Sequence, residues 1–110
     1  MSKYNARQVK ADGYTFDSQA EYHRYQELRL MQAAGAISGL RVHPRYVLIE
    51  PCVVNGQKLP GRSYEGDFEY VEDGRCVCED VKGMRTGVYK LKRALFLRRY
   101  PSIEHREVEA

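Results

Sequence analysis

The sequence predicts one α/β domain of the α+β kind, in which a mixed sheet is flanked by two helices. A capped segment with helical spacing covers residues 19–34, and alternating segments joined by a tight turn span 64–82. A second helical segment then leads to a final alternating segment at 103–108. A hairpin followed by a crossover helix and a strand gives a mixed sheet with helices on its faces. The 110 residues suffice for a single core, so we expect one domain over 1–110.

The first helix has a clear start and stop. Ser18 followed by Glu21 fits a capping box, and Gly35 ends the segment. Its apolar stripe consists of Tyr25, Leu28 and Met31. Glu21 lies one turn before Tyr25 on the same face, which places a carboxylate at the edge of the predicted core.

The strands are less uniform. Residues 45–54 are rich in β-forming side chains, although Pro51 suggests a break or an edge there. Asn55-Gly56 is a turn signal, and we expect 57–63 to be a loop. Residues 64–71 and 75–82 alternate and form a hairpin across Asp73-Gly74.

The two ends of the chain are predicted to differ. Residues 1–11 resemble a loose, flexible basic arm, whereas 103–108 alternate as a strand. The second helix begins near Thr86 and stops before Pro101. We expect its core-facing side to carry Val88, Leu91 and Leu95.

Charge is distributed unevenly, although the net charge is only +3. The segment 82–99 holds seven basic residues and no acidic one. A cationic face of this kind favours phosphate binding, and the simpler alternative is a solvated helix face. The basic residues are Lys82, Arg85, Lys90, Lys92, Arg93, Arg98 and Arg99.

The three cysteines, Cys52, Cys76 and Cys78, follow a polar N-terminus with no signal-peptide pattern. This odd count predicts free thiols in a reducing, cytoplasmic setting. A zinc site built from them and a histidine is an alternative, but the spacing matches no C-x-x-C pair. No apolar run approaches the roughly 18 residues of a transmembrane helix, so we expect no membrane association.

The acidic residues of the hairpin suggest a metal site. Period two in 75–82 puts Asp80 and Lys82 on one face and Glu79 on the other. Antiparallel pairing across the turn brings Asp67 beside Asp80. Two neighbouring carboxylates repel each other unless a cation lies between them, and oxygen ligands suit Mg²⁺, with Mn²⁺ as a substitute. Lys82 would then position or deprotonate a water, or stabilise charge on a phosphate.

Each of these residues also has a simpler explanation. Asp67 and Asp80 can be solvated strand residues, Lys82 a surface charge, and Glu21 only the capping partner of Ser18. Two further acids share the face of Asp67 and are its rivals as ligands: Glu65 and Glu69.

The histidines and tyrosines carry weaker signals. The histidines show no catalytic pattern and are interpreted as structural or surface residues: His23, His43 and His105. Of these, His43 before Pro44 is the one that could lie near the site. Three tyrosines are interpreted as core residues, with base stacking as the alternative: Tyr22, Tyr64 and Tyr89.

These motifs carry a resemblance over about residues 3–108. The segments 13–22, 43–44, 67–68 and 79–83 resemble a family of short phage and prophage proteins of unknown function, assigned to the PD-(D/E)XK nuclease superfamily. The resemblance implies the core order α-β-β-β-α-β, metal binding by Asp67 and Asp80, and assistance from Lys82, with Glu21 completing the acidic cluster. This chain departs from the superfamily pattern at Gly66, where proline is frequent.

The hypothesis that follows is a Mg²⁺-dependent endonuclease that hydrolyses DNA. The metal would be held by Asp67, Asp80, the carbonyl of Val81 and Glu21. The expected substrates are branched DNA and recombination or replication intermediates, such as a Holliday junction. Backbone phosphates would be contacted by Arg85, Lys90, Lys92 and Arg93.

We also expect a homodimer, because cutting both strands requires two active sites, and action in the cytoplasm of a bacterial host. The main alternative is a DNA-binding module that kept the fold without catalysis, and a protein-interaction factor is the other.

Overall fold

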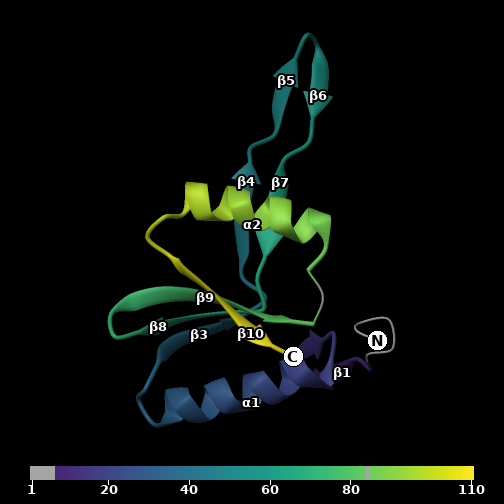
Figure 1. Cartoon of the computed structure of the whole chain (residues 1–110). Helices are drawn as coiled ribbons and strands as arrows, with labels where there is room; N and C mark the ends of the chain where they lie inside the picture. Colours follow the sequence, from purple (N-terminus) through teal and green to yellow (C-terminus); the bar gives the residue numbers. More distant parts are fainter. Residues whose placement is uncertain (1–6, 84) are drawn as a thin grey trace.

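A computed structural model describes residues 7–83 and 85–110 and shows two helices, a central sheet and two-stranded ribbons (Figure 1). In chain order the elements are β1 (Val9–Ala11), β2 (Tyr14–Phe16), α1 (Gln19–Ala33), β3 (Ser38–Val42), β4 (Arg45–Ile49), β5 (Cys52–Val54), β6 (Gln57–Leu59), β7 (Arg62–Glu65), β8 (Phe68–Glu72), β9 (Arg75–Lys82), α2 (Gly87–Arg99) and β10 (Glu104–Glu109). The fold is therefore of the mixed α+β kind that the sequence predicts.

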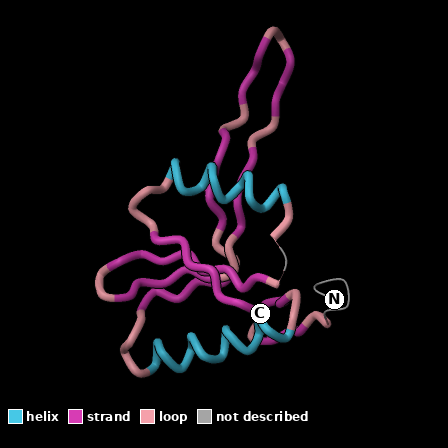
Figure 2. The backbone as a smooth tube through the Cα atoms, in the orientation of Figure 1, coloured by secondary structure: helices cyan, strands magenta, loops and turns pink. Residues whose placement is uncertain are grey.

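The central sheet has the strand order β10-β9-β8-β3. β10 runs parallel to β9, whereas β8 is antiparallel to both β9 and β3. The sheet lies between α1 on one side and α2 on the other (Figure 2). The parallel pair is possible because α2 makes the crossover from β9 to β10.

Two buried clusters lie on the two sides of β9. The cluster on the α1 side contains Phe16, Tyr25, Leu28, Ile37, Phe68, Tyr70, Val77 and Val81. The cluster on the α2 side contains Tyr46, Leu48, Tyr64, Cys78 and Phe96. β9 thus contributes alternate residues to both clusters, as period two requires of a central strand.

The order of helices and strands along the chain departs from the predicted α-β-β-β-α-β. The helices and the central sheet follow α1-β3-β8-β9-α2-β10, but β1 and β2 precede α1, and β4 to β7 intervene between β3 and β8. The prediction also missed β3, whose pairing with β8 is irregular and whose Gly39 has a φ of +65°.

The predicted β-structure over 45–54, with a break at Pro51, is confirmed as β4 and β5, whereas the predicted loop over 57–63 is wrong because it contains β6 and the start of β7. The chain leaves β4 before Pro51, which has no N–H to donate to a ladder, and then continues as β5. β5 pairs with β6 across Asn55-Gly56, and β7 returns beside β4. The turn signal was correct, but it closes a ribbon that projects beyond α2 (Figure 1).

Both helices start where the sequence places them. The Ser18 hydroxyl accepts from the backbone N–H of Glu21 at 3.2 Å, and that of Thr86 accepts from the N–H of Tyr89 at 3.1 Å. The apolar stripe predicted for α2 is wrong for Val88 and Leu91, which are 66% and 63% exposed, whereas Leu95 packs against the cluster on the α2 side. α2 instead buries Phe96 against the ribbon strands β4 and β7.

The N-terminal prediction of a loose arm over 1–11 is wrong in part. Val9–Ala11 pairs as β1 with β2, and Val9 and Ala11 pack against the cluster on the α1 side. Residues 1–6 lie outside the described residues. No helix in the described part of the chain has the length and apolar character of a membrane span.

Candidate active site

Two neighbouring acids of β9, Glu79 and Asp80, are buried on opposite faces of the sheet. Glu79 faces α1, where Arg24 donates to both of its oxygens at 2.7 and 2.9 Å and the Tyr70 hydroxyl donates at 2.6 Å. This bond raises the pKa of Arg24 above its usual value. Glu79 is therefore held in a buried ion pair, and Asp80 is the acid that faces the other side, as period two predicts.

Asp80 lies beside Lys82, the third residue of the acid-x-lysine motif. The Oδ1 atom of Asp80 is 3.6 Å from Nζ of Lys82, and among the described residues it has no hydrogen-bond partner. The ammonium group of Lys82 also lies 4.1 Å from the ring centre of Tyr89, so its charge faces both the carboxylate and an aromatic ring.

Tyr89 links this side of the site to β10. Its hydroxyl donates to Glu107 at 2.5 Å, and this hydrogen bond lowers the pKa of the Glu107 carboxyl. Glu107 pairs with Asp80 in the β9–β10 register. A second strand therefore adds an ionised carboxylate to the same face of the sheet.

Asp67 precedes β8 and is bound to the backbone of β9. Its N–H donates to the Glu79 carbonyl at 3.1 Å, and its Oδ2 accepts from the Val81 N–H at 2.7 Å. Its carboxylate therefore contacts the residue between Asp80 and Lys82. The β8–β9 register pairs Phe68 with Glu79, which agrees with the predicted pairing of Asp67 with Asp80.

The two rivals of Asp67 are placed elsewhere. Glu69 accepts from the Tyr46 hydroxyl at 2.6 Å and from Arg41 at 3.0 Å. Glu65 is exposed in β7, where it pairs with Arg45 outside the central sheet. Both residues are therefore engaged by partners away from Asp80 and Lys82.

Glu21 and His43 complete a second group of possible ligands with Asp67. One ligand atom from each of the three residues lies within 4.8 Å of the others. Nε2 of His43 is 4.0 Å from Oε1 of Glu21, and the His43 N–H donates to the Asp67 carbonyl at 2.9 Å. The Ser18 cap uses the backbone N–H of Glu21, whereas the carboxylate of Glu21 belongs to the group with His43 and Asp67.

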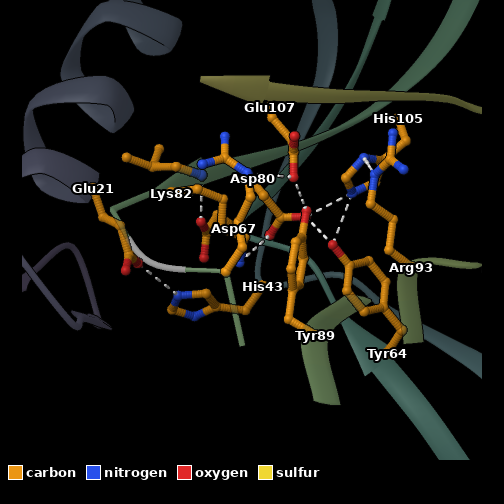
Figure 3. A network of polar contacts seen from close by, with 12 residues as sticks. Glu21, His43, Tyr64, Asp67, Asp80, Lys82, Tyr89, Arg93, His105 and Glu107 are labelled. Carbon is orange, nitrogen blue, oxygen red and sulfur yellow. Dashed lines mark hydrogen bonds and ion pairs between the residues drawn. The ribbon is translucent and has the colours of Figure 1, made fainter. Parts of the chain in front are cut away.

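Sequence reasoning did not predict that His105 and Tyr64 contact Asp80. The buried imidazole of His105 places Nε2 2.9 Å from Oδ2 of Asp80 and 2.8 Å from the Tyr64 hydroxyl, which also hydrogen-bonds to Oδ2 (Figure 3). The alternation in 104–109 indicates that His105 and Glu107 share one face of the strand. Only the parallel pairing of β10 with β9 shows that this face is the one that carries Asp80.

The basic residues predicted to contact phosphates differ in their surroundings. Arg85 pairs with Glu107 at 3.3 Å and Glu109 at 2.8 Å, and Nε of Arg93 donates to Nδ1 of His105 at 3.3 Å. Lys90 is exposed and Lys92 half-buried on α2. Two of the four cations are therefore already engaged by residues of β10.

The described residues include carboxylate ligands of the kind that Mg²⁺ and Mn²⁺ prefer. The alternative zinc site built from the three cysteines is not assembled, because Cys52 is exposed in β5 and Cys78 is buried in β9. Cys78, Asp80 and His105 do lie within 4.8 Å of one another, and in the absence of a metal burial raises the pKa of the Cys78 thiol to about 12. Carboxylates, and the buried Oδ1 of Asp80 that has no hydrogen bond among the described residues, are ligands that also suit Mg²⁺ or Mn²⁺.

Packing explains why glycine precedes Asp67. A Cβ atom at Gly66 would lie 2.7 Å from Sγ of the buried Cys78 and 3.5 Å from Cγ of Pro44. No side chain fits at this position unless β9 or its cysteine moves, so proline is excluded here as well. The departure from the superfamily pattern is therefore linked to Cys78.

The fold and site define a mixed α+β protein with two groups of possible ligands, Glu21, His43 and Asp67 in one and Cys78, Asp80 and His105 in the other, with Lys82 beside Asp80. The hydrogen bond from the Val81 N–H to Asp67 links the two groups. The chain belongs to the family described as "Protein of unknown function (DUF1064)", whose family model matches residues 1–109. No curated protein and no solved structure matches the chain at a significant level. The resemblance to a family of unknown function is thereby confirmed, and its assignment to the nuclease superfamily stays a prediction.

Proposed function

We propose that this protein is a metal-dependent endonuclease that hydrolyses phosphodiester bonds of DNA. One observation carries the proposal: Asp67 is hydrogen-bonded to the N–H of Val81, between Asp80 and Lys82. Two carboxylates and an ammonium group are thus held at the ends of two paired strands, with Glu21 of α1 adjoining Asp67. Carboxylates around a cation, with a lysine beside them, are a workable set for phosphoryl hydrolysis.

The topology supports the same class of enzyme. Without the β1–β2 and β4–β7 additions, the order α1-β3-β8-β9-α2-β10 matches the α-β-β-β-α-β core of the PD-(D/E)XK superfamily. The acid-x-lysine motif occupies the end of β9 and the other acid precedes β8, as the resemblance implies. Fold likeness alone does not fix an activity, so the site residues carry the argument.

Mg²⁺ would be held by Asp67, Asp80, the carbonyl of Val81 and Glu21, and His43 adjoins this group. The bound ion would polarise a phosphoryl oxygen and lower the pKa of a bound water. Lys82, which lies 3.6 Å from Asp80, would orient the attacking water and stabilise the charge that develops on the phosphate.

DNA would be bound mainly through its phosphates. Lys90 and Lys92 of α2 extend the positive charge of Lys82 along the helix, with Arg85 at its start. Such contacts are independent of sequence, which suits a substrate recognised by shape, such as a branched junction. We further propose that the protein is a homodimer acting inside a bacterial host, since two sites are needed to cut both strands.

The ribbon offers a surface through which two copies could associate. Its exposed apolar side chains are Val47, Ile49, Val53, Val54 and Leu59. Sedimentation of the wild-type protein and of a variant with Val53 and Val54 changed to Ser tests the dimer. A monomer at all concentrations would contradict it.

A cleavage panel tests the proposed function. The wild-type protein is incubated with four-way junctions, flaps, linear duplex and single strands, with Mg²⁺, Mn²⁺ or EDTA. We expect metal-dependent products, most from branched DNA, and a loss of about 10²–10⁴-fold in rate for Lys82→Ala. Asp80→Asn should lose at least as much because it removes a ligand charge.

Matched controls separate chemistry from folding. Asp73→Asn makes the same substitution in the exposed β8–β9 turn, and Lys58→Ala does so in β6. Both should cut like the wild type. Equal cleavage by Asp80→Asn and Asp73→Asn would refute the site, and salt-dependent DNA binding without any product would instead favour the non-catalytic module.

A further inference from the structure

We propose that His105, held in one tautomer by Arg93, is a positioning residue that orients the carboxylate of Asp80. The assignment rests on the proposed function, because Asp80 is a ligand there. His105 has no contact with a substrate in this scheme and acts through Asp80 alone. Four elements meet at this point: β7 supplies Tyr64, β9 supplies Asp80, α2 supplies Arg93 and β10 supplies His105.

The hydrogen bonds define the tautomer. A guanidinium nitrogen can only donate, so Nδ1 of His105 must accept from Nε of Arg93, 3.3 Å away. The ring proton of the neutral imidazole then lies on Nε2, which is 2.9 Å from Oδ2 of Asp80. Arg93 thus fixes which imidazole nitrogen faces the acid.

The two oxygens of Asp80 have different tasks as a result. Oδ2 accepts from both His105 and the Tyr64 hydroxyl, whereas Oδ1 faces Lys82 and has no hydrogen bond among the described residues. Because a carboxylate is planar, fixing Oδ2 also fixes the direction of Oδ1. His105 and Tyr64 therefore direct Oδ1 of Asp80 toward the side on which Lys82 lies (Figure 3).

Burial separates this role from DNA contact and from surface charge. The side chains of His105 and Asp80 are both fully buried, so the imidazole is out of reach of a nucleic acid. The parallel pairing of β9 with β10 holds His105 on the strand next to Asp80. In this register His105 is paired with Cys78, and Glu107 is paired with Asp80. Arg93, predicted from the sequence to bind phosphate, acts here as the partner of His105.

Metal affinity in the absence of DNA provides the first test. Partners that orient a ligand typically contribute 10–100-fold to metal affinity, so we expect His105→Phe to weaken Mn²⁺ binding by about that factor in calorimetry. His105→Gln places an amide N–H near the position of Nε2 and should recover most of the affinity. A merely structural role would give the opposite order, because Phe preserves the packed ring and Gln does not.

Arg93 supplies a matched comparison on the same helix. Arg93→Met should weaken Mn²⁺ binding without DNA, whereas Arg98→Met, at an exposed position that donates to the Ala94 carbonyl, should not. If Arg93 instead served only as a phosphate contact, both variants would bind Mn²⁺ like the wild type, and the proposal would be refuted.

The tautomer itself provides a second test that does not depend on any variant folding. Nitrogen-15 NMR of the metal-free wild-type protein should show a proton on Nε2 of His105 and an Nδ1 that accepts a hydrogen bond. A proton on Nδ1 would overturn the assignment even if Mn²⁺ binds. Wild-type protein that binds no Mn²⁺ would refute the proposed function and this role with it, whereas equal affinities of wild type and His105→Phe would refute this role alone.

Discussion

Replacing Arg24 with methionine should destabilise the protein strongly without disturbing the candidate site. Arg24 of α1 is the cation that neutralises Glu79, whose side chain is completely buried in β9. Methionine keeps the length and apolar stem of the side chain but removes the charge. Among the described residues, the carboxylate of Glu79 would then keep the hydroxyl of Tyr70 as its side-chain donor.

The magnitude follows from burial. Removing one partner of a buried ion pair costs about 3–5 kcal/mol, because the other charge remains desolvated. Arg24 is 20% exposed, so water can enter after its removal, and we expect about 3 kcal/mol. For a chain of this size that corresponds to a fall of roughly 12 °C in Tm, at about 4 °C per kcal/mol.

Urea unfolding followed by circular dichroism and tyrosine fluorescence measures the effect, since the chain has no Trp. Arg29→Met is the matched control on the same helix. Its ion pair with Asp12 joins side chains that are 58% and 50% exposed, and its loss should cost no more than about 0.5 kcal/mol. Equal stabilities of the two variants would show that the Arg24–Glu79 pair contributes little and would refute the reasoning.

Three further predictions concern Gly66, the buried Tyr70 hydroxyl and Cys78 thiol, and the reactivity of the cysteines. Gly66→Ala should destabilise the protein by about 1–3 kcal/mol in the same urea assay, and Cys78→Ala in the same chain should recover part of this; strictly additive losses would contradict the clash. The pKa of Tyr70 is raised to about 12 by burial and by its bond to Glu79, and burial raises that of Cys78 to about 12. In the unfolded chain Tyr70 loses its proton near pH 10 and Cys78 near pH 9. The free energy of unfolding should therefore be full below pH 9 and should fall as the pH rises toward 12. An unchanged urea midpoint at about pH 11 would contradict these shifts. In a thiol titration at neutral pH, Cys52 should react quickly and Cys78 only on unfolding, and equal rates would contradict its burial.

Local sequence rules were sufficient where one short segment decides the outcome. The Ser18 cap, the Asn55-Gly56 turn and the alternation of β9 each depend on neighbouring residues, and each is present in the structure. The same alternation correctly separated Asp80 from Glu79. The alternation and the family resemblance both named Asp80 and Lys82, which the fold places 3.6 Å apart, and Asp67 is bonded to the Val81 N–H between them.

Predictions failed where a segment's environment is supplied from elsewhere in the chain. Val88 and Leu91 have the spacing of a core stripe, yet α2 is docked on β4 and β7 through Phe96 instead. The strand β3 lacks a strong pattern and is held by its pairing with β8. Which helix face is buried, and which weak segment becomes a strand, depends on long-range packing that local periodicity does not contain.

The candidate site shows the same division. The sequence by itself determined that Asp80 and Lys82 share a face of one strand, because period two is a property of the backbone. Only the tertiary structure decided that His105 and Tyr64 face Asp80 and that Arg93 faces His105. Those contacts join four elements whose strand order and crossover no local pattern specifies, since they arise when β10 pairs in parallel with β9 after α2.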